Sequence, residues 1–502
     1  MSGNFGIIDL FAGPGGLGEG FSAAGRETDT RMKIHLSIEK EATEVRTLRL
    51  RAFLRSFDDG FPEEYYAALN AGEPLPDWPE LYPARWADAC REARQMELGQ
   101  PGVFEEIAET LDRTREDHDG NTILIGGPPC QAYSLAGRSR NKGKSNYVPE
   151  EDSRHFLYRE YVAILRRLRP AVFVMENVKG MLSSQVDGGE IFERVLDDLR
   201  NAGDGYTLLP ISASREQDNF AARDFIVRAE EHGIPQARHR VFVVGIRNDL
   251  PKPEGEAPLM PIVGEDDRAD VWSVLSSLPA LRSGLSRQED SAEAWREVVL
   301  EYAEQLIASK DVDGGLRQYI AELAQSGLAR ATDRRKAIIS GGGSRMPPEL
   351  ASWLTDPALE RISGHETRAH ITEDLGRYLF VSAYGHEHGR SPKLSEFPKF
   401  LLPAHRNRDS GAFADRFRVQ IGGRPSSTVT SHISKDGHYF IHPDPAQVRS
   451  LTVREAARLQ TFPDNYVFCG NRTQQYHQVG NAVPPFLAFR IARVIRDMIG
   501  RF

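Results

Sequence analysis

The chain has 502 residues, a formal net charge of −9, and 40% hydrophobic and 27% charged residues, so we expect a globular protein of two or three domains. Since no apolar run could cross a bilayer and no signal-peptide pattern opens the sequence, we expect a cytoplasmic protein without a membrane partner. The three cysteines lie far apart and in no Cys-x-x-Cys or Cys/His cluster, which argues against disulfides and a metal site.

Residues 4–250 alternate short apolar runs with helical patterns, as βαβ units do. The predicted strands are Phe5–Asp9, Ile34–Ile38, Thr122–Ile125, Val172–Met175, Thr207–Ile211 and Val241–Val244. The predicted helices are Leu17–Ala24, Ala42–Leu54, Leu157–Leu168 and Ile191–Ala202. Short, mostly apolar strands are typical of sheets buried on both faces, so the sequence predicts an α/β fold with a mostly parallel, twisted sheet.

Two parts of the chain interrupt this pattern. Residues 55–120 are rich in proline, tyrosine and tryptophan, and we expect an insertion with its own small apolar cluster. After about Asn248 a proline-rich linker leads into a helical stretch, Trp295–Leu328, and from Arg424 the chain becomes regular again, ending in a helical pattern at Pro485–Ile499. The predicted parts are residues 1–247, an inserted smaller domain at 248–423, and a return to the first domain at 424–502.

A glycine-rich turn follows the first strand. Gly13, Gly15 and Gly18 have the G-x-G-x-x-G spacing, which brings the backbone and a helix N-terminus close to a bound nucleotide or nucleoside. Glu39 ends the second strand, where a carboxylate can accept hydrogen bonds from both ribose hydroxyls. The spacing alone fits a nicotinamide dehydrogenase, a methyltransferase or a bare turn, and it favours a nucleoside cofactor.

Cys130 follows the predicted strand at Thr122–Ile125 in the run Gly-Gly-Pro-Pro-Cys-Gln. Open parallel sheets bind their ligands at the carboxyl ends of strands, and Pro128 and Pro129 fix the backbone before the thiol. Most free cysteines are small buried hydrophobic residues. A cysteine that leaves a strand into a polar, basic loop is instead typical of a nucleophile.

An acid and two arginines border the neighbouring strands. Glu176 follows the strand at Val172–Met175; facing Cys130 it could protonate a ring nitrogen of a base, or else it could cap a turn. Arg238 and Arg240 alternate as they enter the next strand, so their side chains share one face, as part of a site or as surface ion pairs. The pattern predicts a cationic face beside the carboxyl edge of the sheet.

Two further blocks lie near the end of the sequence. Thr452 and Glu455 have the spacing of a capping box, which favours a structural role for the helix that follows. The run Gln478-Val-Gly480-Asn481 is a Gly-Asn turn before the last helix and could close over a cofactor.

Taken in order along the chain, these blocks resemble the DNA cytosine-5 methyltransferase family. They are Phe-Ala-Gly-Pro-Gly-Gly (11–16), Pro-Pro-Cys-Gln (128–131), Glu-Asn-Val (176–178), Gln-x-Arg-x-Arg (236–240), Arg-x-Leu-Thr-x-Arg-Glu (449–455) and Gln-Val-Gly-Asn (478–481). One block would be weak evidence, whereas six in the same order are specific.

The resemblance implies a Rossmann-like, S-adenosylmethionine-dependent domain that acts on double-stranded DNA. The cofactor would be bound by Phe11, Gly13, Gly16, Glu39, Pro129, Asn481 and Val483. Cys130 would add to carbon 6 of a cytosine flipped out of the duplex, which makes carbon 5 able to accept a methyl group. Glu176 would bind the ring at nitrogen 3 and the exocyclic amine, while Arg238 and Arg240 hold the base and its phosphate.

The resemblance also places a target-recognition domain at residues 248–423, where the basic segment His405–Arg424 is the candidate for DNA contacts. The sequence departs from the family in three ways. No acid can be assigned at the end of the third strand, the loop after Cys130 is longer, and Ala482 replaces the usual serine. We expect a monomer on DNA that works in restriction-modification or phage defence with a cognate partner protein, or that acts alone.

Other functions remain open on the sequence. An RNA (tRNA) cytosine-5 methyltransferase uses the same core, although that branch has a small second domain. A non-catalytic DNA-binding regulator could keep the fold, although the intact Cys130, Glu176, Arg238 and Arg240 speak against it. A nicotinamide dehydrogenase explains the glycine turn and none of the later blocks.

Overall fold

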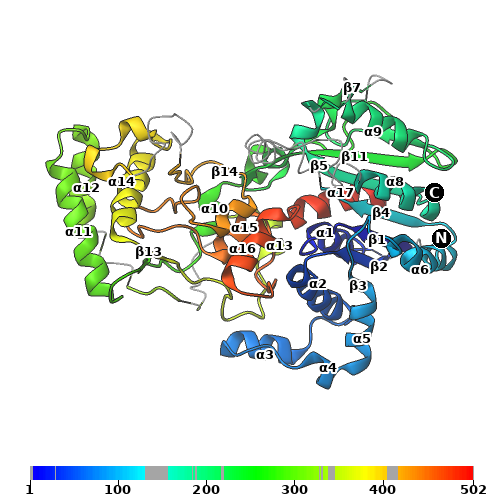
Figure 1. Ribbon diagram of the computed structural model, residues 1–502, viewed down its shortest axis with the longest axis horizontal. Coiled ribbons are helices and arrows are strands. Elements are labelled where there is room, and N and C mark those ends of the chain that lie inside the picture. Colours follow the sequence, from blue (N-terminus) through cyan, green and yellow to red (C-terminus); the bar gives the residue numbers. More distant parts are fainter. Residues whose placement is uncertain are drawn as a thin grey trace.

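A computed structural model describes residues 4–500 except 29, 130–156, 184, 187–188, 216–219, 327, 329–331, 337, 339–344 and 404–415. Within these residues the main sheet has eight strands in the order β3-β2-β1-β4-β5-β11-β8, with β9 also paired to β11 (Figure 1). The strands are β1 (Phe5–Leu10), β2 (Met32–Glu39), β3 (Ala93–Gln95), β4 (Thr122–Gly126), β5 (Val172–Val178), β8 (Tyr206–Leu209), β9 (Ile226–Arg228) and β11 (His239–Arg247). Strand β11 is antiparallel to its neighbours, and the other pairs are parallel.

Helices cover both faces of this sheet. Consecutive strand residues such as Ile7 and Ile8 belong to different apolar clusters, one on each face. One cluster includes α1 (Gly16–Ala24) and α17 (Pro485–Ile499), and the other includes α6 (Val103–Asp117), α8 (Leu157–Leu168) and α9 (Ile191–Arg200). This doubly covered, mostly parallel sheet confirms the predicted fold class.

The predicted elements of the sheet are present within a few residues of their expected bounds. Strands β3 and β9 were not predicted, and each has only three residues. The predicted helical stretch Trp295–Leu328 is two helices, α11 (Ala292–Ala308) and α12 (Gly314–Ser326). The break has a local cause, since Asp313 accepts a hydrogen bond from the backbone N–H of Leu316 and two glycines follow it.

The chain reverses its direction of winding at β1. Strands β2 and β3 lie on one side of β1, while β4 and β5 lie on the other. Such a switch point leaves a crevice at the carboxyl ends of the two central strands, here Leu10 of β1 and Gly126 of β4, which are paired in register. The glycine turn and the Gly-Pro-Pro turn both begin at this crevice.

The predicted insertion at 55–120 contains α3 (Glu63–Ala71), α4 (Trp78–Leu81), α5 (Pro83–Glu92), β3 and α6. Aromatic residues of α3 to α5 pack with α2 (Ala42–Arg55) in a separate apolar cluster. Helix α3 also reaches across the chain, because Tyr66 donates to Asp356 at 2.8 Å and Asn70 donates to the carbonyl of Ala358 at 2.9 Å. The insertion therefore completes one edge of the sheet and contacts the part of the chain beyond residue 248.

We call residues 248–423 the intervening region, and residues 4–247 with 424–500 the core region. The intervening region contains α10 (Val271–Leu275), β12 (Gly284–Leu285), α11, α12, α13 (Pro348–Leu354), β13 (Ala369–His370) and α14 (Thr372–His388). Helices α11, α12 and α14 form an apolar cluster at the end of the molecule away from the sheet (Figure 1). Helices α10 and α13 pack instead into the cluster that lies under the sheet.

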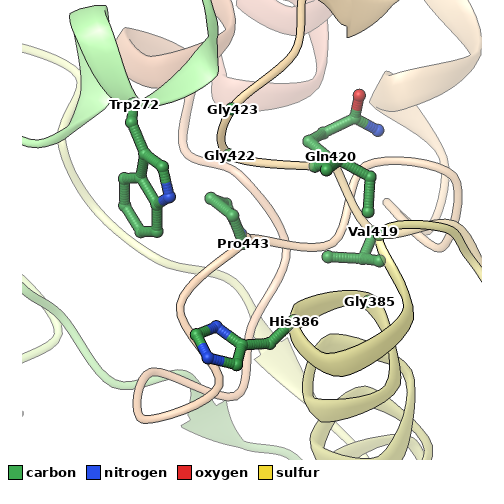
Figure 2. Close-up of a pocket in the computed structure, with 10 residues that line it drawn as sticks. Trp272, Gly385, His386, Val419, Gln420, Gly422, Gly423 and Pro443 are labelled. Atoms are coloured by element: carbon green, nitrogen blue, oxygen red, sulfur yellow. The ribbon is translucent and has the colours of Figure 1, made fainter.

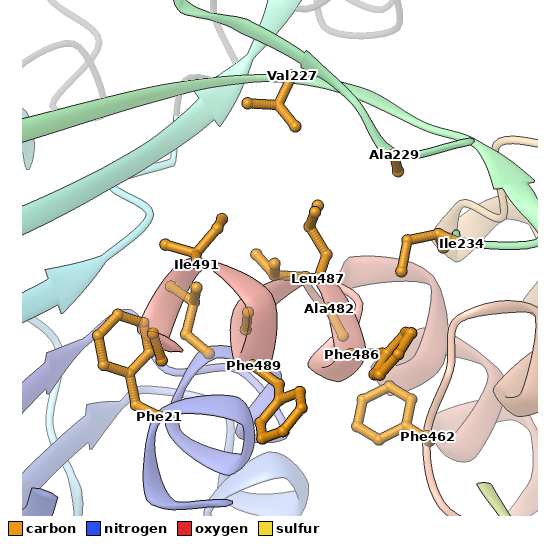
Figure 3. Packing of buried hydrophobic residues seen from close by; sticks show 14 of the residues in the cluster. Phe21, Val227, Ala229, Ile234, Phe462, Ala482, Phe486, Leu487, Phe489 and Ile491 are labelled. Carbon is orange, nitrogen blue, oxygen red and sulfur yellow. The ribbon is translucent and has the colours of Figure 1, made fainter. Parts of the chain in front are cut away.

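The chain returns to the sheet through β14 (Ser426–Ser427), α15 (Val453–Leu459), α16 (Arg472–Asn481) and α17. Strand β14 pairs with β10 (Gln236–Ala237), directly before β11. Helix α17 packs against α1, where Phe21 faces Ile491 and Phe489 among other buried side chains (Figure 3). In the described part of the chain no helix is long and apolar enough to cross a membrane.

Candidate active site at the carboxyl edge of the sheet

The turn that follows β1 requires glycine at two positions, each for its own reason. Gly15 has φ +98° and precedes α1 directly, a left-handed backbone that favours glycine. Gly16 is required for a different reason, because a Cβ there would lie 2.1 Å from the carbonyl oxygen of Val483. The turn is therefore pressed against the segment that follows α16, which brings together Gly16 and Val483, two of the residues that the sequence analysis names for the cofactor site.

Glu39 fixes the other side of the same turn. Its Oε2 accepts from the backbone N–H of Gly13 at 2.9 Å, and its Oε1 accepts from those of Lys40 and Glu41 at 2.8 and 2.9 Å. Burial, together with the nearby Glu44, raises the pKa of Glu39. A carboxylate held between the ends of β1 and β2 can accept ribose hydroxyls, so the residues present fit a bound nucleoside.

Asn481, the last residue of α16, has an exposed side chain whose Nδ2 lies 3.1 Å from Nδ1 of His477. His477 in turn lies 3.4 Å from Glu44 of α2, and this contact raises the pKa of the imidazole. The Gly-Asn turn is thus tied to α2 beside the glycine turn. Among the predicted cofactor residues Phe11 is strained, with φ +55°, and Pro129 is the last described residue before Cys130.

Asp9 is a buried residue at this edge that the sequence analysis did not single out. Its side chain is 1% exposed, and within the described residues neither oxygen has a hydrogen bond of normal geometry. Burial raises the pKa of Asp9 to about 8. It lies beneath α1, since a Cβ at Gly18 would be 2.9 Å from its Oδ2. The signal that could have identified it is an acid near the end of an otherwise apolar strand.

Glu176 and Arg240 form an ion pair on adjacent strands. The Nε of Arg240 lies 3.1 Å from Oε1 of Glu176, and both side chains are largely buried. The other carboxylate oxygen faces the turn before Cys130, because a Cβ at Gly127 would lie 2.8 Å from Oε2. Asn177 donates to the carbonyl of Pro128 at 3.1 Å. The Glu-Asn pair therefore holds the turn that leads to the predicted nucleophile.

Arg238 is buried between the core region and the return segment. Its Nη1 donates to the carbonyl of Val429 at 2.9 Å, while its Nε has no partner within the described residues. Burial, with Arg240 nearby, lowers the pKa of Arg238. A buried guanidinium is costly unless an anion or acceptor meets it, so its orphaned N–H suits a ligand that arrives from outside the chain.

Two predictions lie outside the described residues. Cys130 belongs to the undescribed segment 130–156, as do the basic residues that follow it. Most of the predicted DNA-binding segment, His405–Arg424, falls in the gap at 404–415. Of its described residues, Arg416 lies 3.5 Å from Asp436, and Arg424 is exposed.

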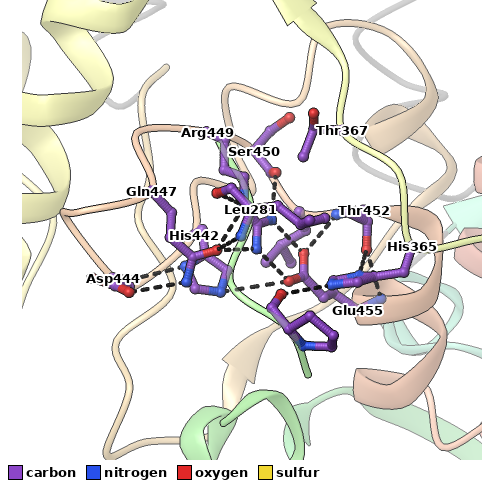
Figure 4. Close-up of polar contacts among 12 residues, drawn as sticks. Leu281, His365, Thr367, His442, Asp444, Gln447, Arg449, Ser450, Thr452 and Glu455 are labelled. Carbon is purple, nitrogen blue, oxygen red and sulfur yellow. Dashed lines mark hydrogen bonds and ion pairs between the residues drawn. The ribbon is translucent and has the colours of Figure 1, made fainter. Parts of the chain in front are cut away.

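The Arg449–Glu455 pair organises the junction with the intervening region (Figure 4). Two nitrogens of Arg449 donate to Glu455 at 2.7 and 2.6 Å, and both side chains are 1% exposed. Glu455 also accepts from the backbone N–H of Thr452 at 2.7 Å, which confirms the predicted capping box. His365 of the intervening region joins this network through Thr452 at 3.1 Å. These contacts support a structural role.

A separate pocket lies in the intervening region between α10, α14 and the segment 419–423 (Figure 2). Trp272, His386 and Pro443 are among the residues that line it, and none of its lining residues was predicted for catalysis or cofactor binding. Over the described residues, no group of three or more His, Cys, Asp or Glu side chains could hold a metal ion.

Comparisons with known proteins place this architecture in a class. The sheet, with a glycine turn at its switch point, defines a doubly wound, Rossmann-like α/β enzyme. An Escherichia coli structure, described as a DNA modification methyltransferase encoded within a prophage, shares this fold with a TM-score of 0.53 and 20% identity over 99% of both chains.

The model of the C-5 cytosine-specific DNA methylase family matches residues 100–497, and the chain belongs to that family. The chain is 31% identical to type II methyltransferase M.Bpa9945I of Bacillus paralicheniformis over 98% of this chain and 99% of that protein. It is 28% identical to type II methyltransferase M.AgeI of Thalassovita gelatinovora, with the same shares covered. The resemblance in the sequence is confirmed, and the protein is a DNA cytosine-5 methyltransferase.

Proposed function

We propose that the protein methylates carbon 5 of a cytosine flipped out of double-stranded DNA, with Cys130 as the nucleophile. The observation that carries this proposal is the Glu176–Arg240 pair beside Gly127, because it holds an acid against the turn that ends at Cys130. The same sheet edge holds the glycine turn, so a cofactor and a base would meet there.

S-adenosylmethionine, the cofactor of this family, supplies the methyl group when bound. The residues that would hold it are Phe11, Gly13, Gly16, Glu39, Pro129, Asn481 and Val483. Glu39 already faces the turn through Gly13, and Val483 already closes on Gly16, which supports the assignment. Glu97, the first acid after β3, is the candidate for the adenine contact that the sequence left unassigned.

The residues of the chain perform complementary steps. Addition of the Cys130 thiolate to carbon 6 makes carbon 5 nucleophilic, so that carbon 5 can bond to the methyl group as the methyl leaves the sulfonium sulfur of the cofactor. A base then takes the carbon 5 proton, and the electron pair of that bond restores the ring double bond and expels the thiolate. The carboxyl group of Glu176 donates a proton or a hydrogen bond to nitrogen 3 and accepts a hydrogen bond from the exocyclic amine, which draws electrons from the ring. Arg240 positions Glu176, and Arg238, whose Nε–H has no partner within the described residues, donates to an acceptor on the target nucleotide.

We assign residues 248–423 to target recognition, 1–247 to catalysis and cofactor binding, and 424–502 to the return. A close contact within residues 424–502 supports treating them as one part, because a Cβ at Gly480 would lie 2.2 Å from the backbone nitrogen of Ser431 in the loop after β14. Exposed basic residues beside this loop, Arg424 and Lys435, are candidates for phosphate contacts together with the segment 405–424.

We infer that the enzyme modifies DNA within a type II restriction-modification system. The supporting observation is that relatives matched along almost their whole length are named type II methyltransferases. Such an enzyme would act in the cytoplasm as a monomer on DNA, with a cognate nuclease or another defence protein as its partner.

Transfer of labelled methyl groups to duplex DNA or to transfer RNA tests the substrate. We expect label in DNA alone; label in RNA alone would overturn the proposal. Cys130→Ser should abolish transfer, and Cys90→Ser, the same change at a partly exposed cysteine outside the proposed site, is the matched control. Unchanged activity in Cys130→Ser would refute the nucleophile, and DNA binding without any transfer by the wild type would favour a regulator. Bisulfite sequencing of DNA from expressing cells then identifies the target sequence.

A further inference from the structure

Two buried glutamines, Gln236 and Gln460, face each other beneath the proposed site, and both are 0% exposed. Gln236 lies two residues before Arg238 in the sequence, and Gln460 follows α15. The Nε2 of Gln236 donates to Oε1 of Gln460 at 2.9 Å. Nothing in the proposed chemistry uses this pair, yet burying two amides is costly unless their polar atoms are matched.

Every N–H of the pair is matched. The second donor bond of Gln236 goes to the carbonyl of Leu459 at 3.1 Å. Both donor bonds of Gln460 go to the carbonyls of Val479 and Ala482, at 2.6 and 3.2 Å. Rotating the Gln460 amide by half a turn would set its oxygen against two carbonyl oxygens, so only one orientation is compatible with its neighbours.

The pair joins the two sides of the site. On one side, the carbonyls of Val479 and Ala482 fix the segment 479–483, which carries Asn481 and closes on Gly16. On the other side, Oε1 of Gln236 accepts from the backbone N–H of Val429 at 2.8 Å, and the Val429 carbonyl accepts from Arg238. A continuous buried chain of hydrogen bonds thus runs from the segment 479–483, which we call the cofactor wall because it carries proposed cofactor residues, to Arg238, which is proposed to hold the base.

We propose that Gln460, paired with Gln236, is a positioning residue that sets the cofactor wall relative to the flipped base. The inference rests on the proposed function, because it assumes that the segment 479–483 and Arg238 meet the two reactants. Methyl transfer needs its reacting atoms at near-contact distance, and a displacement of about 1 Å can cost about 100-fold in rate. The pair should therefore govern the rate of transfer more than the binding of either reactant.

Single-turnover methyl transfer tests the proposal in Gln460→Glu and Gln460→Met. We expect both to slow transfer by roughly 10- to 100-fold, while dissociation constants for S-adenosylhomocysteine and for duplex DNA stay close to those of the wild type. The protonated carboxyl of Gln460→Glu can restore one of the two lost donors. Its rate relative to wild type should therefore rise as the pH is lowered, whereas the relative rate of Gln460→Met should not.

Gln447→Met is the matched control, because Gln447 is a buried amide that bonds to Asp444, Leu281 and Arg449 and to neither side of the site. It should lower stability without slowing transfer by bound complexes. If Gln460→Met does not fold, Gln460→Asn, which keeps the amide on a shorter side chain, takes its place. Wild-type rates in the Gln460 variants, or equal slowing in Gln447→Met, would overturn the inference. An inactive wild type would refute the proposed function instead.

Discussion

The core region and the intervening region are held together differently. Strands β1, β4 and β5 are buried along most of their length with helices on both faces, so apolar burial dominates the core region. In the intervening region β12 and β13 have two residues each, and buried polar side chains such as His365 and His370 connect its segments. The two regions thus differ mainly in how their segments are joined, by long paired strands in the core region and by very short strands and side-chain contacts in the intervening region.

The largest effect that we expect is a loss of methyl transfer from a substitution in the core region, which a substitution in the intervening region should not cause. Glu176→Gln removes the acid of the core region and should lower the rate of methyl transfer by about 1000-fold, because a positioned acid contributes roughly 10²- to 10⁴-fold. Glu396→Gln breaks the exposed ion pair with Arg390 in the intervening region and is the control. The measurement is the rate of methyl transfer by both variants under saturating cofactor and DNA. Equal rates in the two variants would contradict the assignment of catalysis to Glu176 in the core region.

The second effect concerns the junction. Glu455→Gln leaves the guanidinium of Arg449 buried without its carboxylate, which should cost about 3–5 kcal/mol of unfolding free energy. Because the network extends to Leu281 and His365, hydrogen exchange should increase near those residues while β1 and β4 stay protected. Uniform loosening of sheet and junction would show that the two regions unfold as one unit.

Acid should weaken the intervening region before the sheet. Burial lowers the pKa of His365 to about 4, and the unfolded imidazole titrates near its usual 6.5. The unfolded state therefore binds more protons between these values, so the contribution of His365 to stability is full above about pH 6.5 and is lost as the pH falls toward about 4.

Urea unfolding measures this loss. Between about pH 7 and about pH 5, the wild type should lose roughly 1–2 kcal/mol more than His365→Gln. His386→Gln, a change at an exposed histidine of the same region, should keep the wild-type pH dependence. If the unfolding free energy of His365→Gln depends on pH as that of the wild type does, His365 is not the source of the loss of stability in acid.

The smallest effect tests the DNA-facing surface. Lys435→Ala should weaken binding to duplex DNA by a few-fold and reduce the slope of log affinity against log salt by about 0.9, as expected for one lost phosphate contact. Lys33, exposed near the amino end of β2 and thus at the opposite edge of the sheet, provides the control in Lys33→Ala. Equal slopes for Lys435→Ala and the wild type would remove Lys435 from the proposed interface.

The sequence predicted the core region better than the intervening region for a physical reason. Long apolar runs and glycine spacings are local signals, so the sheet and the turn at Gly13 were predictable. Strand β3 has only three residues and lies inside a proline-rich segment, so it is too short for an alternation of apolar and polar residues to be recognised. The partners of Gln460 and His365 are likewise distant in sequence, and no local pattern encodes a contact between residues that tertiary folding brings together.

The close approach of Gly16 to the carbonyl of Val483 has a consequence for the timing of synthesis. Gly16 and Val483 are 467 positions apart in the sequence (483 minus 16), so a ribosome that adds about 5–20 residues per second makes the glycine turn roughly 20 to 90 seconds before it makes the segment that packs against it. Nascent chains would therefore remain unable to methylate DNA until residue 483 has been made and has packed against the turn, so each molecule gains its activity in one late step.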